Sequence, residues 1–309
     1  MDTLARKLAK GYWTLEDLKV RYADIRRLTD KGYRVHSYKV SGKTYYSILA
    51  ESENVSLHLS GATPDAKHYK WLELSDLHAG SKQFDELGLR EILGKAVKDG
   101  YKMCFIAGDL HDGTHIYPGH MVNLRFFSAE DQANLLAEIL MDYPLHYYAT
   151  TGNHDYSFEK EGGVNPCHLL QEKVQNFVYL PYFAADIIIG GVLRRQIHGA
   201  TGRAYALSYP GQTYIRNLLD ASGEHAYVKG KKYRLRFIQL GHFHSVIHYE
   251  SAGIQVTQSG NFQFPNEYTV RRGLVGPQGG RFVDVVIQNG QILSYNSRFE
   301  KPTNGRGSR

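Results

Sequence analysis

The hydrophobic pattern of this 309-residue chain changes near residue 70. Beyond that point, short apolar runs alternate with stretches of helical periodicity at residues 84–98 and 129–141. The region after residue 270 predicts two or three closing strands, with Asn289-Gly290 as a hairpin turn. Strands that alternate with helices indicate an α/β fold, in which ligands bind outside the carboxyl ends of the strands.

The first 50 residues follow a different pattern. Three short helices are predicted, at residues 3–10, 14–20 and 23–30. Thr14 has the position of a helix cap, with Asp17 three residues later. Two strand-like runs then flank Ser41-Gly42-Lys43 and indicate a β-hairpin. Three helices followed by a hairpin resemble a winged helix-turn-helix domain.

A polar segment separates the two patterns. Residues 51–69 contain a glycine and a proline, and this composition is typical of a linker. We therefore expect a basic, winged-helix-like domain at residues 1–50, a linker at 51–69 and a large domain at 70–309.

Five polar clusters follow five of the apolar runs in the second part of the chain. They are Asp76-Leu77-His78, Gly108-Asp109, Gly152-Asn153-His154-Asp155, His198-Gly199 and Gly241-His242-Phe243-His244. Because each cluster lies where a predicted strand ends, the five can converge on one site. In an extended D-x-H or H-x-H, side chains two residues apart point to the same side. Carboxylate, imidazole and amide oxygen donors suit divalent ions such as Mn²⁺, Fe²⁺, Ni²⁺ or Zn²⁺.

In this order, the clusters resemble the calcineurin-like metallophosphoesterase superfamily, whose pattern is D-x-H, G-D, G-N-H-D/E, H and G-H-x-H. The resemblance implies a β-sandwich flanked by helices, in four αββα layers, after the winged-helix-like domain. It also implies two divalent metal ions, with Mn²⁺ as the first expectation and Fe²⁺, Ni²⁺ or Zn²⁺ as alternatives. The implied ligands are Asp76, His78 and His244 for one ion and Asn153, His198 and His242 for the other, with Asp109 bridging both.

The same resemblance separates His154 from the ligands. It implies that His154 faces the substrate and assists the leaving group or stabilises the phosphoryl charge, and that Asp155 orients its ring through the other nitrogen. Gly108, Gly152 and Gly241 precede site residues, and we expect them to let the backbone turn sharply there.

The segment after Asp109 narrows the resemblance within the superfamily. Asp112 completes a G-D-x-x-D, and Gly113 stands where Ser/Thr protein phosphatases carry an arginine. In lacking this arginine and in having Gly80 soon after His78, the chain resembles SbcD-type DNA-repair exonucleases more than it resembles the protein phosphatases.

Five further residues are candidates for substrate binding. They are His111, Asp112, Arg203, Arg271 and Arg272. For His111 a role in loop packing is equally consistent with the sequence. For each arginine, an exposed loop position without a function is an alternative.

Charge is concentrated in the first 50 residues. They carry 11 Lys/Arg and 5 Asp/Glu, and the rest of the chain carries 26 of each, so this segment accounts for the whole net charge of +6. A compact basic segment favours a polyanion partner, and a solvated basic face is the alternative. With the SbcD-like motifs, this charge makes DNA the expected partner.

Three functions are consistent with these features. The first is a dimetal phosphodiesterase that acts on DNA as an exo- or endonuclease and uses a metal-bridging hydroxide. The second is a phosphatase or phosphodiesterase of nucleotides or other small phosphoesters, because one fold hosts many substrates. The third is a DNA-binding regulator with a vestigial phosphoesterase domain, and the complete ligand set argues against it.

The remaining composition bears on the compartment and on partners. The chain has two cysteines, Cys104 and Cys167, and lacks a signal-peptide pattern and a long apolar stretch. These features favour a cytoplasmic protein that does not cross a membrane. SbcD-type enzymes are often dimeric, so a homodimer is consistent with the resemblance. The short region after Val270 leaves no room for an ATPase-docking domain, so we do not expect an ATPase partner.

Overall fold

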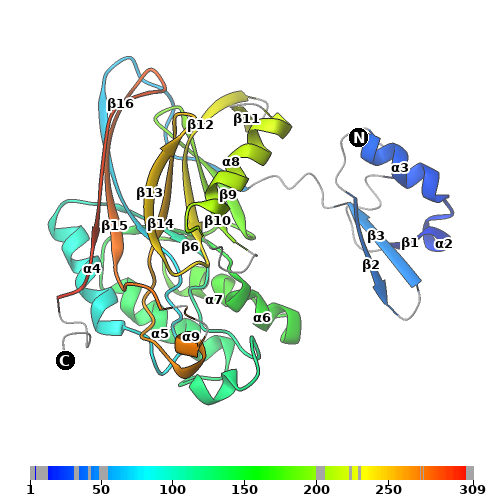
Figure 1. Cartoon of the computed structure of the whole chain (residues 1–309), viewed down its shortest axis with the longest axis horizontal. Coiled ribbons are helices and arrows are strands. Elements are labelled where there is room, and N and C mark those ends of the chain that lie inside the picture. Colours follow the sequence, from blue (N-terminus) through cyan, green and yellow to red (C-terminus); the bar gives the residue numbers. More distant parts are fainter. Residues whose placement is uncertain are drawn as a thin grey trace. The chain divides into compact units, whose positions relative to one another are not determined.

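The computed structural model describes residues 4, 13–30, 35–40, 43–48, 55–199, 206–222, 225–228, 231–271, 273 and 275–303 (Figure 1). The chain forms two compact units, Met1–Val55 and Ser56–Arg309. Strand β4 (Val55–His58) and the start of β5 (Lys67–Leu74) lie in the range expected to be a linker. Folded structure of the larger unit therefore begins before residue 70.

In its described residues, the smaller unit has a three-stranded antiparallel sheet and two short helices. Its elements are β1 (Trp13–Thr14), α2 (Leu15–Leu18), α3 (Tyr22–Asp30), β2 (Val35–Val40) and β3 (Lys43–Ile48), and the sheet order is β1-β3-β2. The second and third predicted helices and the hairpin are present, whereas β1 was not expected. Of the first predicted helix, at residues 3–10, only Leu4 lies within the described residues.

The start of α2 follows from its sequence. The hydroxyl of Thr14 accepts a hydrogen bond from the backbone N–H of Asp17 at 3.1 Å, and the Asp17 carboxylate accepts one from the backbone N–H of Thr14 at 3.0 Å. This reciprocal capping box satisfies two N–H groups that a helix terminus otherwise leaves unpaired. The predicted cap at Thr14 is confirmed.

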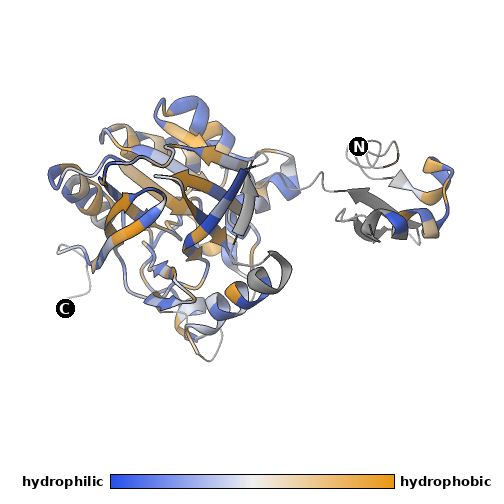
Figure 2. Cartoon of the chain, turned by 90° about the horizontal axis from the view of Figure 1, so that it is seen from above, coloured by the Kyte–Doolittle hydropathy of each residue, from blue (hydrophilic) through white to orange (hydrophobic). Residues whose placement is uncertain are grey.

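Two sheets form the centre of the larger unit. One has the order β16-β15-β5-β6-β7-β8 and contains, besides β5, strands β6 (Met103–Ala107), β7 (His146–Thr150), β8 (Phe177–Tyr179), β15 (Gly280–Gln288) and β16 (Gln291–Glu300). The other has the order β13-β14-β12-β10-β9-β4, with β11 paired to β12, and contains, besides β4, strands β9 (Ala184–Ile189), β10 (Val192–His198), β11 (His225–Val228), β12 (Lys231–Gly241), β13 (Val246–Ser251) and β14 (Ile254–Ser259). Apolar residues lie along the central strands of the unit (Figure 2).

Helices cover the outer faces of both sheets. Against the first sheet pack α4 (Glu86–Lys98), α5 (Ala129–Met141) and α7 (Pro166–Lys173), whose buried residues share one core with Leu72, Cys104 and Tyr147. Helix α8 (Tyr209–Ser222) lies against the second sheet, where Ile215 joins the core of β9, β10, β12 and β14. The four-layer αββα architecture is therefore confirmed. The described helices also include α6 (Asn153–Gly162), α9 (Glu267–Arg271) and the 3₁₀ turn His120–Asn123.

Several local predictions are confirmed in this unit. Helix α5 has the predicted bounds, and α4 begins two residues later than predicted because the carboxylate of Asp85 caps it by accepting from the N–H of Gly88 at 3.0 Å. Asn289 and Gly290 have φ angles of 50° and 70° and join β15 to β16 as a tight hairpin. None of the helices in the described part of the chain combines the length and apolar character that a bilayer span requires.

Candidate metal centre

The expected metal ligands lie where strands end. Asp76 and His78 follow β5, Asp109 follows β6, Asn153 follows β7 as the first residue of α6, His198 ends β10, and His242 and His244 follow β12. Strands β5, β6 and β7 are parallel, as are β10 and β12 in the other sheet. The carboxyl ends of five strands therefore meet at one edge of the sandwich, which brings all seven side chains together.

Five of these residues have a left-handed backbone. They are Asp76, His78, Asp109, His242 and His244, with φ angles of 55°, 55°, 52°, 86° and 48°. This conformation costs roughly 1–2 kcal/mol for a residue with a Cβ, and such strain gathers at functional sites. The expectation of an extended D-x-H was therefore wrong. The chain turns at both residues, and Leu77 between them is fully buried in the core.

The glycines next to the ligands have two different roles. Gly108 has a φ of 77° and makes the expected sharp turn. Gly152 has an ordinary φ of −107°, but a Cβ there would lie 2.0 Å from a carboxylate oxygen of Asp109. A Cβ at Gly241 would come equally close to the carbonyl oxygen of Ala107. For these two glycines the expectation was wrong, because close approach and not a turn requires them.

The first group of donors consists of Asp76, His78 and His244. The Nε2 atoms of His78 and His244 lie 3.0 Å apart, and Oδ1 of Asp76 lies 3.6 Å from Nε2 of His244. The Nδ1 of His78 lies 3.0 Å from the Asp112 carboxylate, which accepts a hydrogen bond from the Nδ1–H group. This hydrogen bond leaves a lone pair on Nε2 of His78, directed at the other two donors.

The second group consists of Asp109, Asn153, His198 and His242. The Asn153 side-chain oxygen lies 2.9 Å from Nδ1 of His242 and 3.2 Å from Nε2 of His198, and Oδ2 of Asp109 lies 3.2 Å from the same Nε2. Nδ1 of His198 donates to the carbonyl oxygen of Ala107 at 2.8 Å, so its Nε2 is the nitrogen that faces inward and is available to a metal ion. Asp109 additionally lies within reach of His78 and His154, between the two groups.

The electrostatics of this edge suit cations. Burial raises the pKa of Asp76 to about 6, whereas His198 and His154 outweigh the burial of Asp109 and hold its pKa well below the usual value. Burial lowers the pKa of His198 but the nearby Asp109 carboxylate raises it more, to about 9. Buried imidazoles and carboxylates thus face one another at about hydrogen-bond distance, and the protons that they share are ones that a divalent ion can displace. A divalent ion in each group would satisfy them, so the residues fit two metal ions.

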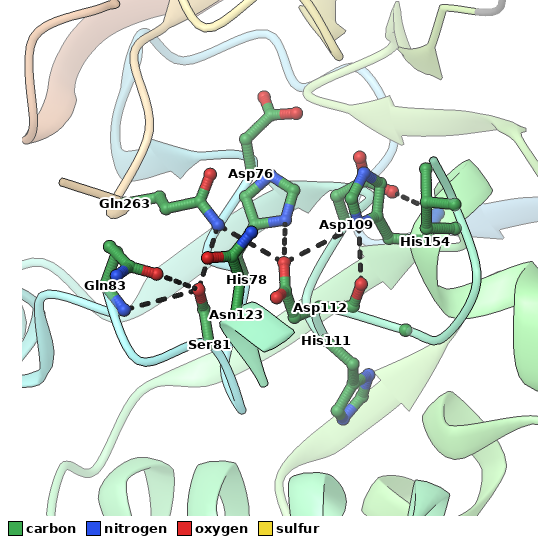
Figure 3. A network of polar contacts seen from close by, with 12 residues as sticks. Asp76, His78, Ser81, Gln83, Asp109, His111, Asp112, Asn123, His154 and Gln263 are labelled. Atoms are coloured by element: carbon green, nitrogen blue, oxygen red, sulfur yellow. Dashed lines mark hydrogen bonds and ion pairs between the residues drawn. The ribbon is translucent and has the colours of Figure 1, made fainter. Parts of the chain in front are cut away.

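Asp112 connects His78 and His120 through its carboxylate and His154 through its backbone carbonyl, and the sequence did not indicate these contacts. Its carboxylate lies 3.0 Å from Nδ1 of His78 and 3.2 Å from Nε2 of His120, and it accepts a 3.3 Å hydrogen bond from Gln263 (Figure 3). Burial raises the pKa of Asp112, but the hydrogen bonds from His120 and His78 lower it by more, so the net pKa is well below its usual range. With 1% of its surface exposed, Asp112 holds histidines in place, and its role in substrate binding stays a prediction.

His154 is one of the more accessible side chains at this edge. Its side chain is 14% exposed, against 1% for Asp76 and His78. Its Nδ1 donates to the backbone carbonyl oxygen of Asp112 at 2.6 Å. Burial lowers the pKa of His154 to about 4, which keeps the ring neutral at pH 7, with a lone pair on Nε2.

Asp155 does not orient His154, so that expectation is corrected. Its carboxylate accepts hydrogen bonds from the backbone N–H of Gly152 at 2.8 Å and of His111 at 2.9 Å, and Nδ1 of His111 lies 2.8 Å away. The position of Asp155 at the third residue of α6 explains this, because its side chain turns back toward the start of the helix. His111 is fully buried and braces the loop after Asp109, as the packing alternative stated.

The arginine candidates divide into two kinds. Arg271 lies on α9, where its side chain is 79% exposed and pairs with Glu267 at 3.6 Å. Arg203 and Arg272 lie outside the described residues.

A buried polar network ties the ligand-bearing strands across the sandwich. Gln239 on β12 donates from Nε2 to the carbonyl oxygen of Leu74 at 2.8 Å, and Gln196 on β10 donates to that of Ile106 at 2.5 Å. Both amide oxygens accept from Arg194, which also pairs with Glu73 at 3.2 Å and is fully buried. The network fixes the ends of two facing pairs of strands just before their metal ligands. No local sequence signal marked these residues, because buried glutamines look like ordinary strand positions.

The comparison with family models agrees with this geometry. The model described as calcineurin-like phosphoesterase matches residues 69–264, which is more than half of the chain and includes all seven expected ligands. The chain belongs to the calcineurin-like phosphoesterase family. Several of its His and Asp groups lie close enough together to hold metal ions.

Individual proteins resemble this calcineurin-like phosphoesterase less extensively. The DNA polymerase II small subunits of Pyrococcus furiosus and Pyrococcus abyssi are 33% identical over 95 residues, which is 26% of this chain and 16% and 15% of theirs. The match thus spans about a sixth of the length of these relatives. Among solved structures, an archaeal phosphodiesterase is 11% identical with a TM-score of 0.44, covering 75% of this chain and 99% of its own. Vacuolar protein sorting 29 from Cryptosporidium parvum is 14% identical with a TM-score of 0.40, covering 76% and 97%.

Proposed function

We propose that this calcineurin-like phosphoesterase is a metal-dependent phosphodiesterase that cleaves nucleic acid, with DNA as its substrate. The observation that carries the proposal is the set of donors gathered at one edge of the sandwich, with the partly exposed His154 within reach of His78 and Asp109. Asp76, His78 and His244 would hold one ion and Asn153, His198 and His242 the other, with Asp109 between them. Mn²⁺ is the proposed metal, and Fe²⁺, Ni²⁺ and Zn²⁺ suit the same donors.

When bound, two such ions would supply a hydroxide nucleophile from water and polarise the phosphoryl oxygens. The chain contributes the remaining chemistry. His78 and His198 keep their Nε2 atoms directed inward because Asp112 and the carbonyl of Ala107 accept hydrogen bonds from the opposite ring nitrogens. His154 is neutral, is fixed through Nδ1, and presents Nε2 to a phosphoryl group, where it can take up a proton and deliver it to the leaving oxygen.

Gly113 favours a diester over a phosphoprotein substrate. Ser/Thr protein phosphatases resemble this chain but carry an arginine at this point. Here Gly113 has a φ of 73°, and a Cβ would lie 2.3 Å from the carbonyl oxygen of His154. The backbone therefore leaves no room for the arginine without moving His154. The SbcD-like nuclease assignment remains part of the proposal.

Two observations support DNA as the partner. The smaller unit has the order β1, α2, α3, β2, β3 with the sheet order β1-β3-β2, which suits the proposed winged helix, and residues 1–50 hold the whole net positive charge. The matched relatives are named as subunits of a DNA polymerase. The second candidate function is that of a phosphatase or phosphodiesterase of small phosphoesters. The proposed metal ligands alone do not determine whether the substrate is large or small.

A substrate panel tests the proposal. The full chain is incubated with Mn²⁺ and single-stranded DNA, double-stranded DNA, RNA, bis-p-nitrophenyl phosphate or p-nitrophenyl phosphate. We expect cleavage of DNA and of the diester, and little hydrolysis of the monoester. Preferential hydrolysis of the monoester, or of small diesters alone, would select the second candidate.

A further inference from the structure

A stacked pair of tyrosines lies beside the metal centre. Tyr117 belongs to the loop that follows Asp112, and Tyr268 belongs to α9. Their ring centroids are 3.9 Å apart and their planes differ by 4°. Figure 1 places α9 at the same end of the sandwich as α6, which begins with Asn153 and His154.

Hydrogen bonds fix this pair in position. The hydroxyl of Tyr117 accepts from the side-chain amides of Asn123 at 3.1 Å and of Asn266 at 3.4 Å. Asn266 in turn accepts from the backbone N–H of Thr269 at 2.8 Å and so holds the first turn of α9. Tyr117 is therefore held through its hydroxyl, and the helix that carries Tyr268 is held at its start by Asn266. Such preorganisation lowers the entropic cost of binding a ligand.

The pair is close to the proposed chemistry. The ring centroid of Tyr117 lies 4.6 Å from that of His120, and His120 lies 5.7 Å from His154. A single imidazole therefore separates the tyrosine stack from the side chain that faces the phosphoryl group. A row of rings therefore leads from His154 through His120 and Tyr117 to Tyr268.

The surroundings of the stack suit a flat, apolar group attached to an anion. Both tyrosines are half-buried, and Val122 and Val270 on the same two segments are 74% and 58% exposed. The side chain of Arg271, next along α9, is 79% exposed. Exposed apolar side chains next to a cation and an aromatic stack are the features that bind nucleobases and their phosphates.

We propose that Tyr117 and Tyr268 form a base-binding subsite, in which the nucleobase next to the reacting phosphate stacks on the tyrosine pair. This subsite rests on the proposed phosphoesterase centre and names the substrate class as nucleotide-containing. Stacking is tolerant of sequence, because every base has an aromatic face.

Equilibrium binding to the full chain tests this subsite. Thymidine 5′-monophosphate and 2-deoxyribose 5-phosphate carry the same phosphate and differ by the base, so the ratio of their dissociation constants isolates the base. With Mn²⁺ present, we expect isothermal titration to show about tenfold tighter binding of the nucleotide to the wild type. Tyr268→Ala should bring the ratio close to one, and Tyr268→Phe, which keeps the ring, should retain it.

Tyr209→Ala is the matched control, because Tyr209 is an exposed tyrosine on α8, and this variant should keep the wild-type ratio. Equal affinity of the wild type for both ligands would overturn the subsite, even if Tyr268→Ala did not fold. Retention of the full ratio by Tyr268→Ala would also overturn it. The nuclease proposal is decided separately by the substrate panel. A base-dependent affinity without DNA cleavage would keep the subsite and point to small nucleotides as substrates.

Discussion

Nδ1 of His78 lies 3.0 Å from the carboxylate of Asp112, and both side chains are 1% exposed. Asp112 thereby sets the tautomer of a proposed metal ligand, while its backbone carbonyl accepts from His154. One residue thus positions a ligand through its side chain and the substrate-facing histidine through its main chain.

The carboxylate of Asp112 is expected to support metal binding. In Asp112→Asn the amide has one acceptor fewer for the protons of His78 and His120, so the inward lone pair of His78 is no longer secured. We expect the affinity for Mn²⁺ to fall about 10- to 100-fold, measured by isothermal titration. Asp65→Asn, at an exposed position, is the control. An unchanged affinity in Asp112→Asn would show that this hydrogen bond has no part in metal binding.

Asp109 lies between the two donor groups, so its charge should matter for both ions. Asp109→Asn removes that charge with little change in shape. We expect metal content, measured by elemental analysis of the purified protein, and diesterase activity to fall together. Full activity in this variant would refute the bridging role.

His154 should affect turnover but not metal content. It lies outside the two proposed ligand groups, and its Nε2 is left for the substrate. His154→Ala is therefore expected to keep both metal ions and to lose at least about 100-fold in kcat, as loss of a proton-transfer group does. Loss of metal from the variant would instead make His154 a ligand.

The buried pair of Arg194 and Glu73 should be important for stability. Arg194 is fully buried, and Glu73 also accepts from Trp71 and Thr257. Arg194→Met leaves a buried carboxylate without its cation, and we expect a loss of about 3–5 kcal/mol in the free energy of unfolding, measured in urea. The double variant with Glu73→Gln should recover part of that loss. If the double variant is as unstable as the single one, the ion pair is not the cause.

The smaller unit should determine the salt dependence of DNA binding. Deletion of residues 1–50 is expected to weaken binding and to flatten the dependence of the affinity on salt, because fewer DNA phosphates are then neutralised by the protein. The logarithmic slope should decrease by about 0.9 for each phosphate that the deleted segment neutralises in the full chain. Hydrolysis of bis-p-nitrophenyl phosphate by the shortened chain serves as the control for folding. An unchanged salt slope would leave the unit with a role other than DNA binding.

The five motifs in the sequence were enough to indicate the family and, through the resemblance, the αββα layers. The convergence of the proposed ligands was also predictable, because they follow apolar strands, and parallel strands bring their carboxyl ends to one edge. The sequence also predicted local features correctly, namely the Thr14 cap, the bounds of α5 and the Asn289-Gly290 turn. Each of these depends on residues at most a few positions apart.

Only the tertiary structure decided which side chains contact one another across the sandwich. Asp155 is next to His154 in sequence, yet it holds His111, while Asp112, 42 residues before His154, supplies the acceptor. The left-handed backbone at Asp76 and His78 is likewise a tertiary feature, because the N–H groups of these residues donate to the carbonyl oxygens of Gly108 and Asp109 on another segment. The stacking of Tyr117 on Tyr268 also depends on the tertiary structure. The two residues are about 150 positions apart, and the hydrophobic pattern of the sequence does not reveal contacts between such distant segments.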